Sequence, residues 1–282
     1  MRVLLVPNTA KKTALDAAAE LAAWLSGSGL EPILTPEDAQ AANLGGFAVS
    51  RIDLGTPALV VALGGDGTIL KAVHILGETE APILGVNFGR LGFLSGARVE
   101  HMREAIESAL ASEARLERRV TLSVDVVMEG RTMGRHRALN EVFFGRGASS
   151  RVVALEVFAN GTQVMRFNGD GIVIATPTGS TAYALSAGGP VVAPDVSALV
   201  VAPLAAHTLS VRPLVVGAST VIDLTLPDTA RADACLTIDG EIVPCRQHVD
   251  RVTVTQGAND VVLVRHDGRE FFDVAAEEFF GV

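Results

Sequence analysis

The sequence predicts an α/β domain with a parallel sheet, followed by an all-β sandwich domain. Two observations support this prediction. Across residues 1–115, apolar runs of strand length alternate with stretches of helical periodicity, which is typical of a Rossmann-like parallel sheet with right-handed crossovers. Across residues 116–266, short β-branched runs follow one another, and turn pairs such as Asn160-Gly161 and Asp239-Gly240 separate them.

The elements are expected in a definite order. In the first domain, strands are predicted at 2–6, 32–34, 58–63 and 83–87, with helices at 13–25, from the next turn to about 76, and at 99–110. In the second domain, strand-like runs occur at 122–127, 152–158, 171–175, 199–201, 211–216, 221–226, 251–255 and 261–264. Residues 267–282 form a tail with a short helix, which we expect to dock back on the first domain.

Composition limits the class of protein. With 282 residues, 49% of them apolar and 20% charged, the chain has enough apolar surface for a large folded core. The net charge of −9 argues against a nucleic-acid partner. No segment is apolar and long enough to predict a membrane span. Cys235 and Cys245 lack the spacing of a zinc site, so reduced thiols and a cytoplasmic location are favoured over a single disulfide.

A glycine-rich turn, Gly64-Gly65-Asp66-Gly67-Thr68, follows the strand predicted at 58–63. Glycines let the backbone approach a bulky anion, and N–H groups at a helix start bind phosphate. Neither the Walker A spacing nor the Gly-x-Gly-x-x-Gly spacing is present. Asp66 would repel a phosphate unless a metal ion or a proton transfer requires it. The alternative is that Asp66 only caps the following helix.

Two stretches of the second domain also stand out. Asn140 and Glu141 lie within the apolar run 138–144, so one of them would face a core unless a ligand receives it, or else they mark a solvated strand end. The stretch 168–190 delivers several Thr and Ser hydroxyls and Tyr183 into a turn rich in Gly and Pro. Hydroxyls and backbone N–H groups suit ribose and amide recognition, and an aromatic ring can cover a base.

Taken together, these stretches resemble the NAD kinase family. The run Pro203-x-x-x-His207-Thr208-Leu209-Ser210-x-Arg212-Pro213-Leu214 adds to the resemblance, and all the blocks occur in the family's order between about residues 55 and 245. The turn at 64–68 alone is shared with diacylglycerol, sphingosine and 6-phosphofructo-kinases. The block Thr176-Pro177-Thr178-Gly179-Ser180-Thr181-Ala182-Tyr183 is much more specific.

The resemblance implies phosphorylation of the 2′-hydroxyl of the adenosine ribose of NAD, with ATP or polyphosphate as donor and a divalent metal, Mg²⁺, as cofactor. It places the active site at the domain interface, with Asp66 as the general base. It also implies that Gly65, Gly67 and Thr68 position phosphate, that Phe93 packs near an adenine, and that the β domain forms a homodimer or homotetramer. The NAD pocket that it implies is lined by Asn140, Glu141, Asp170, Thr178, Thr181, Ala182, Tyr183 and Ser186.

Asn168 departs from the family pattern. An arginine at this position is associated with exclusion of NADH, so the asparagine predicts that NADH is also accepted. Two other functions remain as alternatives. A lipid or sugar kinase would share only the glycine-rich turn and would leave the block at 176–183 unexplained. A catalytically silent dinucleotide sensor would need a damaged Asp66 or Asn140-Glu141, and these residues are intact.

Overall fold

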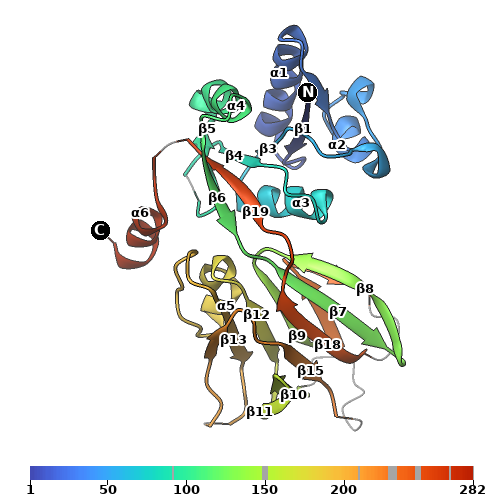
Figure 1. Ribbon diagram of the computed structural model, residues 1–282, viewed down its shortest axis with the longest axis vertical. Helices are drawn as coiled ribbons and strands as arrows, with labels where there is room; N and C mark the ends of the chain where they lie inside the picture. Colours follow the sequence, from blue (N-terminus) through green and yellow to red (C-terminus); the bar gives the residue numbers. More distant parts are fainter. Residues whose placement is uncertain are drawn as a thin grey trace. The chain divides into compact units, whose positions relative to one another are not determined.

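The computed structural model describes residues 1–90, 92–147, 152–208, 210–227, 234–244, 249–266 and 268–281 (Figure 1). The chain divides into two compact units, one formed by Met1–Arg118 with Val261–Val282 and the other by Arg119–Asp260. Leu209 and Cys245, which were noted in the sequence, lie outside the described residues.

The first unit is built on a seven-stranded sheet with the order β2-β1-β3-β4-β19-β6, and β5 pairs with β4 in addition. The pairings between β1 and β2, β1 and β3, β3 and β4, β4 and β5, and β4 and β19 are all parallel, as the alternation of strands and helices predicts. The strands are β1 (Arg2–Pro7), β2 (Glu31–Ile33), β3 (Leu59–Leu63), β4 (Ile83–Asn87), β5 (Ala97–Arg98), β6 (Arg115–Arg119) and β19 (Val261–Arg265).

Helices connect these strands. They are α1 (Lys12–Gly27), α2 (Pro36–Ala41), α3 (Asp66–Leu76) and α4 (Met102–Leu110), with short 3-10 helices at Gly45–Phe47, Arg51–Asp53 and Val99–His101. Helix α2 was not expected from periodicity because it is only six residues long. It begins at Pro36, and the side chain of Thr35 accepts a hydrogen bond from the Asp38 N–H, which is the usual N-cap arrangement.

The end of α1 is stabilised by a Schellman motif. Leu30 N donates to Leu25 O at 3.0 Å, and Gly29 N donates to Ser26 O at 3.1 Å. Gly29 has a φ of 75°, which a residue with a Cβ adopts at a cost. The turn returns the chain to the sheet at β2, beside β1.

Strand β19 was expected in the second domain, which the sequence extended to residue 266, and this assignment is wrong. Leu263 pairs with Ile83 of β4 in the sheet of the first unit. A run of β-branched residues looks the same in any sheet, so the sequence does not reveal which partner strand it joins. The chain therefore leaves the first unit after residue 118 and returns to it at residue 261.

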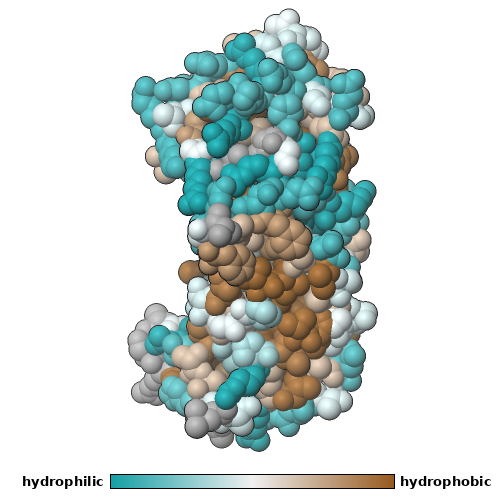
Figure 2. Space-filling model, turned by 90° about the vertical axis from the view of Figure 1, so that its left-hand side faces the viewer, coloured by the Kyte–Doolittle hydropathy of each residue, from teal (hydrophilic) through white to brown (hydrophobic). Residues whose placement is uncertain are grey.

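The C-terminal tail packs on the first unit through α6 (Phe271–Ala275) and one π-helical turn, η6 (Ala276–Phe280). A capping box between Glu270 and Asp273 begins α6. The ion pair between Arg90 and Glu278, at 3.1 Å, ties η6 to the segment after β4. Phe272 of α6 and Phe280 of η6 remain 69% and 70% exposed. Figure 2 shows apolar surface where this tail lies.

The second unit consists of two six-stranded sheets, with the orders β11-β10-β15-β18-β7-β8 and β14-β13-β12-β9-β16-β17. The described strands of both sheets pair antiparallel. The strands are β7 (Leu122–Met128), β8 (Arg131–Ala138), β9 (Glu141–Arg146), β10 (Val153–Ala159), β11 (Thr162–Gly169), β12 (Gly171–Ala175), β13 (Ala198–Leu204), β14 (Leu214–Gly217), β15 (Ile222–Thr225), β16 (Ala234–Ile238), β17 (Glu241–Val243) and β18 (Val249–Gln256).

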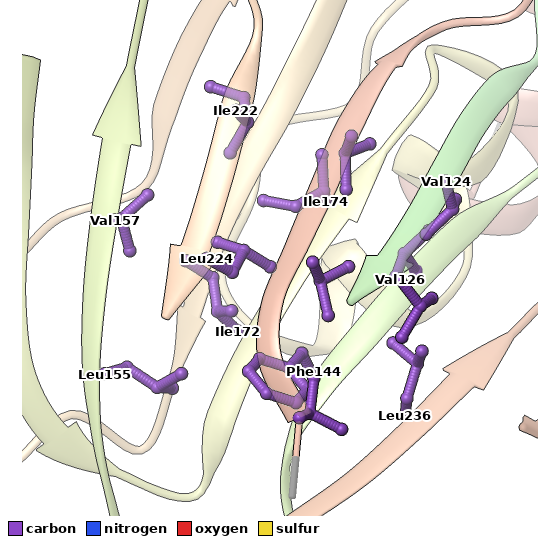
Figure 3. Packing of buried hydrophobic residues seen from close by; sticks show 14 of the residues in the cluster. Val124, Val126, Phe144, Leu155, Val157, Ile172, Ile174, Ile222, Leu224 and Leu236 are labelled. Atoms are coloured by element: carbon purple, nitrogen blue, oxygen red, sulfur yellow. The ribbon is translucent and has the colours of Figure 1, made fainter. Parts of the chain in front are cut away.

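The core of this unit lies between the two sheets (Figure 3). Every second residue of β7 is buried, and Val124 and Val126 meet Phe144, Ile172 and Ile174 from the other sheet in one apolar cluster. This alternation is the period-2 pattern of a strand with one face in a core. The sandwich predicted from the sequence is therefore confirmed.

The outer face of β12 and β13 is covered as well. A 3-10 helix, η4 (Thr178–Thr181), and a short helix, α5 (Tyr183–Ser186), follow β12 and fold back over its sheet. Ala184 and Val192 then pack against Val173, Val200 and Ala202. Because both of its faces are buried, β12 is a continuous apolar run rather than an alternating one.

Among the described residues, no helix has the length and apolar character needed to cross a bilayer.

Gly29→Ala should lower the free energy of unfolding of the first unit by about 1 kcal/mol, because alanine is strained at positive φ. Gly27→Ala, at the end of the same helix, should leave stability unchanged or raise it by up to about 1 kcal/mol. A Cβ at either position meets no atom within 4 Å, so only the backbone conformation separates the two variants. The fluorescence of Trp24, the single tryptophan, which lies in α1, reports urea unfolding of this unit. Equal effects of the two substitutions would contradict the role given to Gly29.

Candidate active site

The glycine-rich turn lies at the carboxyl end of β3, where parallel sheets usually bind ligands. Its first glycine is required by packing, since a Cβ on Gly64 would lie 2.2 Å from the Thr68 hydroxyl oxygen. In contrast, a Cβ on Gly65 or Gly67 would meet no atom within 4 Å. These two glycines therefore face open space, and they stand at the N-terminus of α3, where backbone N–H groups lack helical partners.

This open space is a surface pocket of about 290 Å³. Two parallel strands deliver its lining: the segment after β1 supplies Asn8, Thr9 and Lys11, and the turn after β3 supplies Gly65, Gly67 and Thr68. Lys71, one turn further along α3, completes it. Two lysines and a helix N-terminus make the pocket attractive to an anion such as phosphate.

A neighbouring carboxylate fixes the Lys71 side chain. Its ammonium group forms an ion pair with Asp38 of α2, whose side chain is only 1% exposed. One oxygen of this carboxylate, Oδ2, has no hydrogen-bond partner. A buried carboxylate is stabilised by a nearby cation, so the pair fixes the position of the Lys71 side chain at the pocket wall.

The Asp66 side chain does not cap α3. The N-cap residue is Gly65, and no side-chain bond caps this helix. The Asp66 carboxylate turns instead toward the segment after β4, where it accepts hydrogen bonds from the N–H of Phe93 at 3.2 Å and of Leu94 at 3.4 Å. The capping alternative raised by the sequence is therefore wrong. The carboxylate is oriented by the chain that follows the neighbouring strand.

Burial raises the pKa of Asp66 above its ordinary value, and the backbone hydrogen bonds from Leu94 and Phe93 and the charge of Arg265 oppose this rise. Close packing adds to the burial, because a Cβ on Gly92 would lie 2.6 Å from Asp66 Oδ1. A carboxylate with a raised pKa is a better proton acceptor than one in water, so the site can support general-base chemistry.

Phe93 was expected near an adenine. In the structure its ring stacks on Phe279, with centroids 5.7 Å apart, and contacts Phe271 at 5.6 Å. Both partners belong to the C-terminal tail, so Phe93 is the anchor on which the tail packs. An adenine contact at this residue stays a prediction.

The second unit holds the other group of predicted residues. Asn140 does not lie within a strand, as the sequence suggested, but in the short connection between Ala138, the end of β8, and Glu141, the start of β9. These two strands belong to different sheets, so the connection carries the chain from one sheet to the other. The apolar residues on either side obscured this break in the sequence.

Asp239 holds this connection. Its carboxylate accepts hydrogen bonds from the N–H groups of Leu139, Asn140 and Glu141, at 2.7, 2.7 and 3.0 Å. On the opposite side, Thr176 N donates to Asn140 O at 2.9 Å, and a Cβ on Gly179 would lie 2.1 Å from that same oxygen. The backbone of Asn140 is therefore fixed on both sides, which orients its side chain.

Sequence reasoning treated Asp239 only as half of a hairpin turn. The turn is real, since Asp239 and Gly240 have φ values of 48° and 81° between β16 and β17. The side chain is nevertheless buried at 8% exposure. Nothing in an Asp-Gly pair reveals that the carboxylate reaches back to a segment a hundred residues earlier.

Glu141 is a buried carboxyl group with an unusual titration. Desolvation, and then the charge of Asp239, raise the pKa of Glu141 to about 7, against a hydrogen bond from the Tyr183 backbone. One of its oxygens, Oε2, and the Asn140 Oδ1 are buried without a hydrogen-bond partner. Buried acceptors of this kind are usually satisfied, so both are free to receive a hydroxyl or amide of a ligand.

The hydroxyl-rich block divides into a buried and an exposed part. Thr178 was expected to line a pocket, but it is only 6% exposed, and its hydroxyl oxygen accepts a hydrogen bond from Arg119 at 3.2 Å. Ser180 is fully buried and bonds Pro177 O and Val192 O. These hydroxyls are engaged in holding the turn, because a buried polar group must find partners within the protein.

The remaining predicted residues reach the surface: Thr181, Ala182, Tyr183 and Ser186 after β12, with Asp170 before it and Asn168 on β11. Tyr183 is 38% exposed, and its ring packs on that of Phe143, with centroids 5.7 Å apart. Burial and the charge of Asp170 raise the pKa of Tyr183, and Arg146 opposes this rise. Arg146 also pairs with Asp170 at 3.0 Å, which the sequence did not predict.

Two family models match this chain. A model of the ATP-NAD kinase N-terminal domain matches residues 48–114, and a model of the ATP-NAD kinase C-terminal domain matches residues 139–266. An NAD kinase from Geotalea daltonii is 35% identical over 258 residues, which are 91% of this chain and 90% of the relative. An NAD kinase from Acidobacterium capsulatum is 36% identical over 280 residues, 97% and 96% of the two chains.

Two solved structures resemble the fold. Yeast NADH kinase complexed with NADH has a TM-score of 0.89 and 26% identity, and the match covers 100% of this chain and 87% of that one. An NAD kinase from Archaeoglobus fulgidus in complex with ATP has a TM-score of 0.73 and 26% identity, with 100% and 98% covered. The chain belongs to the NAD kinase family.

Proposed function

We propose that this protein transfers a phosphoryl group from ATP to the 2′-hydroxyl of the adenosine ribose of NAD, with Asp66 as the general base. The observation that carries the proposal is the placement of Asp66: its carboxylate is held by Phe93 and Leu94, outside its own helix, beside a glycine turn that lines a cationic pocket. A base oriented before the substrate arrives lowers the entropic part of the barrier.

The pocket beside the turn is the proposed donor site. Lys11, Lys71 and the N–H groups at the start of α3 would hold the phosphates and balance the charge that develops on the transferred group. These groups recognise phosphate and not a base, so polyphosphate is a second donor to test beside ATP. The similarity to an NAD kinase in complex with ATP favours the nucleotide.

A divalent metal fits this chemistry without a dedicated protein cage. The described residues contain no group of three or more His, Cys, Asp or Glu side chains arranged around one ion. Mg²⁺ commonly keeps several waters and binds through substrate phosphates, so the phosphates of the donor would hold it in place. The bound metal would supply charge neutralisation at the transferred phosphoryl group.

The acceptor is proposed to bind the second unit. Asn140 Oδ1 and Glu141 Oε2 are the unsatisfied acceptors that a ribose diol would fill. Tyr183 offers an aromatic surface, and Asp170, Thr181, Ala182 and Ser186 complete the proposed lining. We further propose a homodimer or homotetramer formed through the all-β unit.

Asp66→Asn should reduce kcat at least about 10²-fold while the KM values for NAD and ATP stay close to those of the wild type, because only proton transfer is impaired. The assay incubates the protein with NAD, ATP and Mg²⁺ and measures NADP with an NADP-specific dehydrogenase. Asp16→Asn is the matched control, since Asp16 is exposed on α1 and pairs with Lys12. Absence of NADP from the wild type would disprove the activity, whereas full turnover of Asp66→Asn would disprove only the role of Asp66.

Binding of NAD should weaken as the pH falls through 7, because protonation of Glu141, whose pKa is about 7, turns a charged acceptor for the ribose diol into a weaker, neutral one. The KM for NAD should then rise by up to about tenfold per pH unit below 7, and Glu141→Gln should abolish this dependence. Steady-state kinetics between about pH 5.5 and 8 provide the test.

The same group should affect stability with a definite sign. The pKa of Glu141 is higher in the folded than in the unfolded state, so its contribution to stability is complete below pH 4.5 and is lost as the pH rises through about 7. Glu141→Gln should therefore gain about 1–3 kcal/mol relative to the wild type at pH 8 and little at pH 5. Unfolding followed by circular dichroism measures this, and a gain independent of pH would argue against a buried charge at Glu141.

NADH should be phosphorylated within about tenfold of the rate for NAD, because the position of the excluding arginine is taken by exposed Asn168. The similarity to yeast NADH kinase supports this expectation. Asn168→Arg should restore a preference for NAD, and Thr162→Arg, which adds the same charge elsewhere on β11, should not. A preference of about a hundredfold for NAD in the wild type would overturn the prediction.

A further inference from the structure

Arg265, the last residue of β19, has its guanidinium buried in the first unit. Its side chain is 10% exposed, and each nitrogen has an acceptor. Nη1 donates to Ser95 O at 2.7 Å, Nη2 donates to Phe93 O at 2.8 Å, and Nε donates to Glu117 Oε2 at 2.6 Å. An arginine held at all of its nitrogens has one orientation, which a lysine could not reproduce.

Two of the residues that accept from Arg265, Phe93 and Ser95, also donate to Asp66. The N–H of Phe93 and Leu94 and the hydroxyl of Ser95 all point toward the Asp66 carboxylate, at 3.2, 3.4 and 3.5 Å. The segment Phe93–Ser95 thus has the carbonyls of Phe93 and Ser95 bound to the guanidinium, while its donors bind the Asp66 carboxylate. Hydrogen bonds in such a chain polarise and strengthen one another.

The end of this segment is fixed independently of Arg265. Gly96 N donates to Gly85 O of β4 at 2.9 Å, and His266 N donates to Gly96 O at 3.0 Å. A Cβ on Gly96 would lie 1.9 Å from Val264 O, so the two strands hold this residue closely. Loss of the Arg265 side chain would therefore release Phe93–Ser95 while the neighbouring backbone stays in register.

We propose that Arg265 is a positioning residue for phosphoryl transfer: by binding the carbonyls of Phe93 and Ser95, it fixes the donors that orient the Asp66 carboxylate. This inference rests on the proposed role of Asp66 as the base. The return of the chain into the first sheet then has a function, because β19 brings the Arg265 guanidinium against the segment Phe93–Ser95.

Charged residues of two other segments lie near Arg265. Glu117 on β6 forms its ion pair, and Arg269 and Glu270 line a small cavity with it ahead of α6. The charge of Arg265 lowers the pKa of Asp66 against the effect of burial. Removing that charge therefore leaves the Asp66 pKa higher.

The test compares Arg265→Gln and Arg265→Lys with the wild type. Arg265→Gln should lower kcat by about 10- to 10²-fold with little change in the KM values for NAD and ATP, because a misplaced base impairs the transition state and not binding. The acid limb of its kcat/KM profile should move to higher pH. Arg265→Lys should restore the limb, since it keeps the charge, but only part of kcat, since it cannot bridge two carbonyls.

Two controls separate positioning from a general loss of stability. Glu117→Gln removes the ion pair but leaves both carbonyl bonds of Arg265 in place, so it should retain kcat even where it lowers the unfolding temperature. Arg115→Gln removes an exposed arginine that pairs with Glu270 and should leave kcat unchanged. Trp24 fluorescence verifies that each variant is folded.

A double-mutant cycle with Asp66→Asn completes the experiment. If Arg265 acts through Asp66, Arg265→Gln should cost little further activity in the Asp66→Asn background. Equal losses in both backgrounds, or an unchanged kcat for Arg265→Gln in an active enzyme, would overturn the positioning role. Absence of NADP formation by the wild type, or full turnover of Asp66→Asn, would instead overturn the proposed function on which it rests.

Discussion

Backbone N–H groups that converge on a single carboxylate organise both units of this protein. In the first unit the carboxylate is Asp66, and its donors come from the segment after the neighbouring strand. In the second it is Asp239, with donors from the connection that carries the chain between two sheets. Hydrogen bonds to a charged acceptor contribute about 1.5–3 kcal/mol each, enough to fix the geometry of a loop that no regular strand or helix supports.

Glu141 shows what happens where such donors are scarce. It receives a bond from the Tyr183 backbone, and Oε2 remains unsatisfied beside the negative charge of Asp239. A core designed only for stability would place an apolar residue there. Proteins tolerate such a local loss of stability where a site must recognise a polar ligand. The buried, unsatisfied acceptors of Asn140 and Glu141 fit this pattern.

Much of the first unit could be predicted because its signals are local. Apolar runs, the glycine turn and the end of α1 at Gly29 identify β1, β3, β4 and their helices, and alternation implies the parallel sheet. The assignment of β19 failed because sheet membership depends on the partner strand, which lies about 180 residues earlier in the chain.

In the site, residue types were predictable and their roles less so. The glycine turn and Asp66 were identified from spacing, and their position at the carboxyl end of β3 follows from the α/β pattern. The burial of Thr178, the tail on Phe93, and the reach of Asp239 and Arg265 depend on segments brought together only by the tertiary fold. No spacing in the chain encodes those distances.

The return of β19 also bears on synthesis. A ribosome makes residues 1–118 long before it reaches residue 265. The Asp66 side chain is therefore present early, but it gains its fixed orientation only after the all-β unit has been made.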